Sequence, residues 1–208
     1  SPGDCLVLVG LADFSGNNST HVLSAGWLWD RNTAVVMRHV AQAIESFDAA
    51  AKKKESPSRG CVGRGIPVEI EQILHPPNCP EISFLKLKSD PGTAGTARDS
   101  WMNVNANQAE VWRMKRKKLR YYSFQQLPKA EGINGGHGFP LTEYSPEFCR
   151  EGDCEAQIEF EKRQHFLNPG NPPNNLEKGG VLADESGKII GMVVRDSSII
   201  WSQAIEQD

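Results

Sequence analysis

The stretch AVVMRHV, residues 34–40, decides the interpretation of this sequence, because a run of apolar and β-branched side chains ends directly at His39. Such a run predicts a buried strand. A second apolar run, SAGWLW at residues 24–29, precedes it across a short polar turn. The two runs together predict a strand pair that leads into a helix, with His39 at the junction between the second strand and the helix. A histidine there can be structural or functional.

Short apolar runs of the same kind recur along the chain, at residues 5–11, 21–29, 33–37, 66–74, 82–87, 119–124, 156–160, 188–194 and 198–204. Alternation is clearest in VEIEQI at residues 68–73, as expected for a half-buried strand. Many short strands separated by turns predict an all-β sandwich or barrel.

Two segments depart from this strand pattern and predict helices. After His39, the residues Val40, Ile44 and Phe47 form one apolar face of a helix that ends in three lysines at residues 52–54. Lysines suit a helix C-terminus because cations oppose the carbonyl end of the helix dipole. The second helix is predicted over residues 105–120, after a loop at residues 91–96. By contrast, DESG at residues 184–187 predicts a hairpin turn with glycine at a positive φ.

The composition is that of a folded, mildly acidic chain. Among 208 residues, 23 basic and 26 acidic side chains give a net charge of -3, which excludes a generally basic nucleic-acid binder. No apolar run approaches the ~18 residues of a membrane-spanning helix. The chain opens with SPG, as a cut end would, so we leave the compartment open, with the periplasm or another non-cytosolic space expected if a targeting segment was removed.

The chain has five cysteines, and this odd number argues against a complete disulfide framework. Free thiols are the favoured interpretation. Two pairs, Cys61 with Cys79 and Cys149 with Cys154, are left open as disulfides for an oxidising compartment. We expect no structural zinc site, because the chain has no C-x-x-C pair and its five histidines lack ligand spacing, and we expect no cofactor.

Three segments resemble, in order and spacing, the trypsin-like (chymotrypsin-fold) serine proteases of the bacterial housekeeping type. The strand pair at residues 24–40 resembles the pair that ends at the catalytic histidine of this family. The segments ILHP at 73–76 and EISFLKL at 81–87 resemble the motif that carries the aspartate orienting that histidine. The segments GGVLAD at 179–184 and GKIIGMV at 187–193 resemble the motif that carries the nucleophile.

The resemblance implies two six-stranded antiparallel barrels with a catalytic cleft between them, in a single trypsin-like domain spanning residues 1–208. The N-terminal barrel would cover residues 1–90 and the C-terminal barrel residues 119–208. Residues 91–118 would form an enlarged connection that contains a basic helix.

The catalytic positions depart from the family pattern. His39 occupies the place of the general base. Glu81 stands where the family has aspartate, and it is equally interpretable as a longer partner of the histidine or as an exposed acid at the rim. Lys178 occupies the slot of the serine. An activated lysine amine attacks carbonyls to form Schiff bases, not acyl-enzymes.

No shift of the alignment restores a nucleophile, because residues 155–185 contain no serine, threonine or cysteine. The positions equivalent to the oxyanion hole are Leu176 and Lys178. Leu176 replaces the glycine two residues before the nucleophile, close to two prolines that lack amide donors. Losing the nucleophile alone costs ~10⁶ in kcat in this mechanism.

We therefore expect a catalytically inactive trypsin-like homologue that acts as a protein-binding or regulatory module, with a protein or peptide partner. One alternative is an active endopeptidase with an unusual nucleophile, for which Ser100, Ser123, Ser145 or a cysteine are equal candidates. Another is a metal-binding or purely structural relative. The simplest outcome for Lys178 is an ion pair with a nearby acid that fills the cleft.

A second candidate for binding is the run RMKRKKLR at residues 113–120, which carries six cations. The simplest interpretation is a solvated helix face. Docking of an acidic protein ranks next, above nucleic-acid binding. The residues of this basic run are Arg113, Lys115, Arg116, Lys117, Lys118 and Arg120. The oligomeric state is left open.

Overall fold

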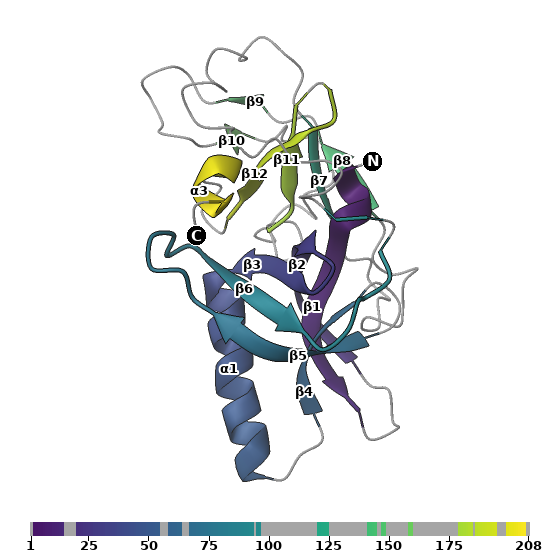
Figure 1. Cartoon of the computed structure of the whole chain (residues 1–208), viewed down its shortest axis with the longest axis vertical. Coiled ribbons are helices and arrows are strands. Elements are labelled where there is room, and N and C mark those ends of the chain that lie inside the picture. The colour runs from purple at the N-terminus through teal and green to yellow at the C-terminus, as the bar shows by residue number, and fades with distance from the viewer. Residues whose placement is uncertain are drawn as a thin grey trace, which may run out of the picture.

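The structure is a computed structural model that describes residues 2–14, 20–54, 58–63, 67–93, 95–96, 120–124, 141–144, 147–148, 158–159, 179–184, 186–194 and 199–206. Its first layer is a closed antiparallel barrel with the strand order β1-β2-β3-β6-β5-β4 (Figure 1). The strands are β1 (Leu6–Asp13), β2 (Thr20–Asp30), β3 (Thr33–Met37), β4 (Ser58–Gly63), β5 (Pro67–Leu74) and β6 (Ile82–Leu87). A short 3-10 helix, η1 (Pro2–Cys5), precedes β1.

The barrel interior is tight where β2 crosses it. A Cβ on Gly26 would lie 2.9 Å from Val9 Cγ2 and 3.0 Å from Val36 Cγ1. Since Gly26 faces the interior, the next residue, Trp27, and Trp29 face outward. Both are nevertheless buried, with 0% and 7% of their surface exposed. The outer face of β2 is therefore covered by another part of the molecule.

The cover is a second sheet. Within the described residues it has five strands in the order β13-β12-β11-β7-β8. They are β7 (Arg120–Phe124), β8 (Leu141–Tyr144), β11 (Val181–Ala183), β12 (Ile189–Val193) and β13 (Ile199–Trp201). Side chains of β11 and β12 belong to the same hydrophobic core as those of the barrel. The two layers thus share one core, while a closed six-stranded second barrel stays a prediction.

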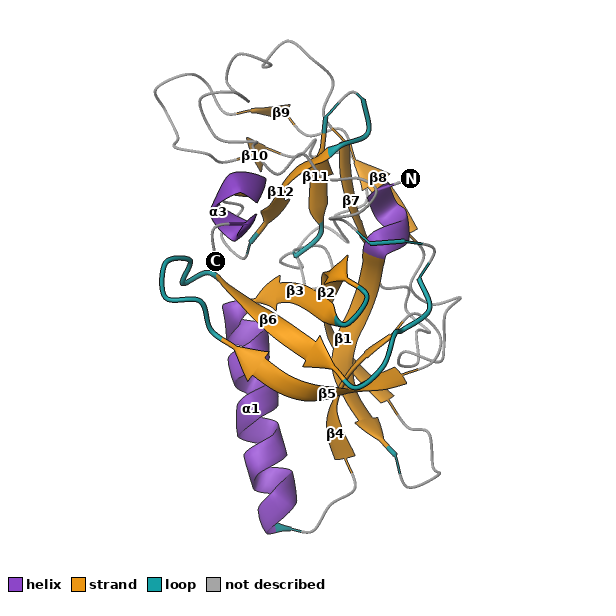
Figure 2. Cartoon of the chain, in the orientation of Figure 1, coloured by secondary structure: helices purple, strands orange, loops and turns teal. Residues whose placement is uncertain are grey.

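The other elements among the described residues are helical or form a small sheet (Figure 2). Helix α1 (Arg38–Lys53) follows β3 and lies along the first barrel, and α3 (Ser202–Glu206) follows β13. Strands β9 (Glu147–Phe148) and β10 (Ile158–Glu159) pair with each other. No helix in the described ranges is long and apolar enough to cross a membrane.

Most strand predictions are confirmed, and β3 and β6 have the predicted bounds. Three details are wrong. Phe47 is 37% exposed, so it is not part of the buried face of α1 that includes Val40 and Ile44. Residues 202–206 continue from β13 as helix α3 instead of strand. Arg120 begins strand β7 instead of ending a helix, because its backbone is paired with Ala183 of β11.

Four of the described strands, β4, β8, β9 and β11, lie outside the apolar runs that predicted strands. The β4 sequence SRGCVG has two glycines and little apolar alternation, so pairing with β1 and β5 makes it a strand. The turn at residues 184–187 is confirmed. Gly187 has φ 82°, and its N–H donates to the Asp184 carbonyl at 3.0 Å.

Cys5, Cys61 and Cys79 are buried free thiols, as the favoured interpretation predicts. No disulfide therefore joins Cys61 to Cys79. Cys149 and Cys154 lie outside the described residues.

Candidate functional site

His39 is the second residue of helix α1, directly after the end of β3. The strand ends and the helix begins at this point because residues 38–53 contain neither glycine nor proline and are rich in alanine, which favours a helix. Buried Val40, Ala41 and Ile44 pack the first turns of α1 against the barrel. The half-buried His39 is thereby held at a strand–helix junction, as the sequence predicts.

Glu81 lies opposite this junction on the neighbouring strand. Strands β3 and β6 pair with Met37 opposite Ile82, and the Arg38 N–H donates to the Glu81 carbonyl at 2.9 Å. The backbone of Glu81 is therefore hydrogen-bonded to the residue directly before His39. The Glu81 side chain is exposed, and its Oε2 atom is 3.8 Å from the Cys79 Sγ atom. The backbone relation that the resemblance implies is present, and the roles of the two side chains stay a prediction.

The segment before Glu81 is held by a residue that sequence reasoning missed, Arg38. Its Nε atom donates to the Ile82 carbonyl at 2.9 Å, and its terminal nitrogen NH2 donates to the carbonyls of Pro76 at 2.6 Å and Cys79 at 3.2 Å. No pattern in the sequence indicates this, because the acceptors are backbone atoms about forty positions away.

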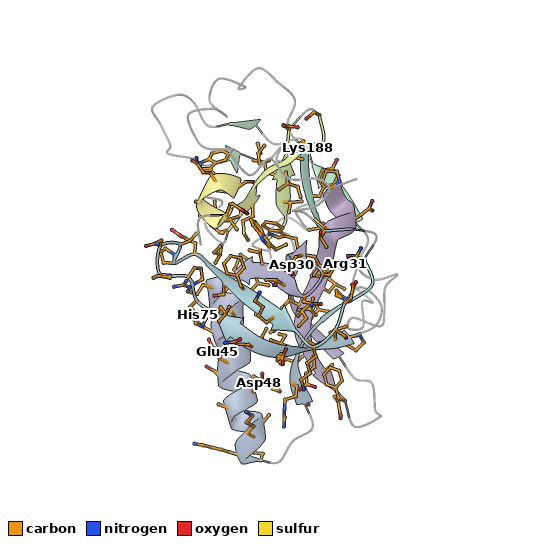
Figure 3. The ribbon with its side chains drawn as sticks, viewed as in Figure 1. Asp30, Arg31, Glu45, Asp48, His75 and Lys188 are labelled. Atoms are coloured by element: carbon orange, nitrogen blue, oxygen red, sulfur yellow. The ribbon has the colours of Figure 1, made fainter. Side chains whose placement is uncertain are left out.

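A second cluster that was missed joins α1 to β5 and β6. His75 Nε2 lies 2.5 Å from Glu45 Oε1, and His75 Nδ1 lies 2.7 Å from Ser83 Oγ (Figure 3). A carboxylate only accepts hydrogen bonds, so a neutral His75 donates from Nε2 and accepts the Ser83 hydroxyl proton at Nδ1. The order hydroxyl, imidazole, carboxylate is that of a serine protease triad. Ser83 is 0% exposed, however, so a substrate has no access to it and the cluster is structural.

The third segment that resembles the family begins at Gly179, which lies close to the end of β3. Lys178 and Leu176 themselves lie outside the described residues. The N–H of Gly179 donates to the Val193 carbonyl of β12 at 2.7 Å. Gly179 has φ 83°, and a Cβ there would lie 2.8 Å from the Ala25 carbonyl oxygen and 3.2 Å from Met37 Cε. The residue after Lys178 is therefore packed between the two layers, beside the strand that leads to His39.

Burial raises the pKa of two groups near the far end of α1, Asp48 and Cys61. The Gly60 N–H donates to Asp48 Oδ1 at 3.0 Å. Burial raises the pKa of the Asp48 carboxyl, although this hydrogen bond and the nearby Arg59 oppose the shift. Burial, with a contribution from the Asp48 charge, raises the pKa of Cys61 to about 12. Cys61 is thus a protonated thiol at neutral pH, which argues against it as an unusual nucleophile.

Of the basic run, only Arg120 is among the described residues, as the first residue of β7. Arg113, Lys115, Arg116, Lys117 and Lys118 lie outside them. Of the alternative nucleophiles, Ser123 lies in β7 opposite Thr142 of β8, and Ser100 and Ser145 are outside the described residues.

Comparison with solved structures finds similar chains at low sequence identity. Kallikrein-related peptidase 10 shares 14% identity, with 98% of this chain and 88% of that chain covered and a TM-score of 0.49, both in a structure solved alone and in one with Zn²⁺. Deg5 shares 15% identity, with 99% and 87% covered and a TM-score of 0.49. No family model matches this chain, and no curated protein matches its sequence.

The described residues form a mostly-β structure with a closed six-stranded barrel and a second sheet, which is consistent with the trypsin-like (chymotrypsin) fold. Similarity at this low identity says nothing about activity. The fold class rests on the closed six-stranded barrel, on a histidine and an acid at the paired ends of β3 and β6, and on a glycine pair that joins the second sheet to the barrel.

Proposed function

We propose that this chain is a trypsin-like domain that does not hydrolyse peptides and instead binds a protein or peptide in its cleft. The observation that carries the proposal is the identity of residue 178. Gly179, the first of the glycine pair, lies against Met37, and the residue before it is lysine. A lysine there supplies no hydroxyl for acyl transfer.

The chemistry of the neighbouring residues supports the absence of hydrolysis. Residues 155–185 contain no hydroxyl or thiol side chain. The one hydroxyl that the structure places on an imidazole backed by a carboxylate, among the described residues, is Ser83, and it is fully buried. Cys61 is also buried, with its thiol protonated at neutral pH. None of these groups replaces the missing serine.

Binding without cleavage is supported by the form of the second sheet. In the described part of the chain, β13 and β8 are its outer strands. The backbone of an outer strand can pair with an extended peptide, which gives affinity without chemistry.

The test of inactivity uses unfolded casein as substrate and a fluorophosphonate as the covalent probe. We expect no cleavage and no labelled residue at protein concentrations where trypsin gives both. His39→Ala is the control for a contaminating protease, because contamination persists in that variant. Cleavage by the parent chain that disappears in His39→Ala would overturn the proposal.

The test of binding uses the same unfolded casein, labelled with a fluorophore and followed by anisotropy. Lys178→Glu should weaken binding at least fivefold. Lys188→Glu is the matched control, because Lys188 is exposed on the β11–β12 hairpin, at the end of the second sheet away from α1 (Figure 3). Equal weakening by both variants would mean that net charge, and not the cleft, governs binding. No binding by the parent chain refutes this part of the proposal.

A further inference from the structure

The connection between β5 and β6, residues 75–81, is poor in backbone hydrogen-bond donors. Pro76, Pro77 and Pro80 have no N–H. The bond that closes its turn, from the Ile82 N–H to the Cys79 carbonyl, is long at 3.4 Å. The conformation of this connection, which carries Glu81, therefore depends on donors from outside it.

Arg38 supplies these donors at three places along the connection. Its guanidinium reaches the carbonyl of Pro76 near the start, that of Cys79 in the middle and that of Ile82 just after the end. A guanidinium has five N–H groups in a rigid planar fork, so one side chain can hold several carbonyls in a fixed arrangement. A lysine ammonium at the same place is a single point of attachment and cannot span the three.

The same residue also holds Glu81 through its backbone, because the Arg38 N–H donates to the Glu81 carbonyl at 2.9 Å. His39 is the next residue in the chain. Side chain and backbone of Arg38 thus fix the residues on both sides of Glu81 against the first turn of α1.

We propose that Arg38 is the positioning residue of the candidate site, setting where the Glu81 carboxylate lies relative to the His39 imidazole. This rests on the candidate pair His39 and Glu81 from the proposed function. It holds whether the cleft binds or cleaves, because residue 178 takes no part in it.

A second attachment of the same connection provides a matched control. His75, at the start of the connection, bonds Glu45 of α1 and Ser83 of β6. Glu45 belongs to the same helix as Arg38 and is exposed. Arg38 could instead be only one of several attachments between α1 and the barrel. In that case, weakening either attachment should change the His39 imidazole signals to a similar degree.

The experiment records the imidazole ¹H–¹⁵N signals of His39, assigned with His39→Ala. We expect Glu81→Gln to shift them, Arg38→Lys to shift them by at least half as much, and the double variant to add nothing to Glu81→Gln. Glu45→Gln should move the His75 signals and leave those of His39 unchanged. The proposal fails if Arg38→Lys leaves His39 unchanged, if its effect adds fully to that of Glu81→Gln, or if Glu81→Gln itself has no effect.

A measurement on the unaltered protein covers the case in which Arg38→Lys does not fold. Couplings across hydrogen bonds should be detectable from Arg38 Nε to the carbonyl carbon of Ile82, and their absence would refute the arrangement. None of these spectra involves a substrate. A protein that cleaves casein while giving the expected spectra would refute the proposed function and leave the role of Arg38 standing.

Discussion

Replacing Gly179 by alanine should destabilise the protein much more than replacing Gly187, although the two glycines have nearly the same backbone conformation. Their φ angles are 83° and 82°. An alanine at Gly187 meets no atom within 4 Å, whereas at Gly179 its Cβ would lie 2.8 Å from the Ala25 carbonyl oxygen and 3.2 Å from Met37 Cε. Comparing the two variants separates the cost of backbone strain from the cost of the close contact between the layers.

The expected sizes follow from these two contributions. A left-handed conformation costs an alanine roughly 1–2 kcal/mol relative to glycine, and this applies to both variants. Overpacking at Gly179 adds about 1–3 kcal/mol, because the Ala25 carbonyl is part of the β2 backbone and cannot rotate away as a side chain could. Gly187→Ala should therefore lose about 1–2 kcal/mol and Gly179→Ala about 2–5 kcal/mol.

Urea unfolding, followed by tryptophan fluorescence, measures the stability of both variants, since Trp27 is buried in the shared core. With a slope of roughly 2 kcal/mol per molar urea, the midpoints of the two variants should differ by about 0.5–1.5 M. Equal midpoints would refute the packing of Gly179 against the first barrel. They would also remove the structural support for placing residue 178 in the nucleophile slot.

Three further predictions concern groups away from the cleft. The pKa of Cys61 is raised from 9.0 to about 12 in the folded state, so the free energy of unfolding should fall as pH rises from about 9 towards 12, and should fall less in Cys61→Ala. Iodoacetamide at pH 8 should leave Cys61 unlabelled in the native protein, and rapid labelling would contradict this. Burial raises the pKa of Asp48, so its charged form lowers the stability of the folded protein. The stability of Asp48→Asn in urea unfolding should therefore rise relative to the parent between pH 3 and pH 7, because the amide oxygen can still accept the Gly60 N–H. A gain in stability that does not depend on pH would exclude this cause. His75→Ala leaves the buried Ser83 hydroxyl without its partner and should cost about 1–3 kcal/mol, part of which Ser83→Ala in the same chain recovers; a fully additive second loss would argue against the bond.

Most strands of the first barrel were predictable because each is a short apolar run that its own residues reveal. Residues 33–37 and 82–87 are apolar runs bounded by polar turns, and both became strands with the predicted bounds. Strand β4 was not predictable in this way, since its glycines form a strand only through pairing with two neighbours. Phe47 was predicted to share one apolar face of the helix with Val40 and Ile44, but 37% of its surface is exposed.

The candidate site likewise contains residues that the sequence singled out and residues that it did not. His39 and Glu81 were singled out because the segments around them resemble motifs of the family, and their roles stay a prediction. Arg38 and the cluster of His75 with Glu45 and Ser83 were not found. Their partners are backbone carbonyls or side chains many positions away, and no local pattern records such a contact.

The sequence by itself determined which chemical groups are available, and above all that residues 155–185 offer lysine and no hydroxyl or thiol beside the glycine pair. It also determined most strands of the barrel, though not β4, because an alternating or continuous run of apolar side chains is a local property of the chain. Only the tertiary structure decided what those groups meet. The three carbonyls on Arg38, the burial of Ser83 beneath His75 and the packing of Gly179 against Ala25 all arise when distant segments close on one core.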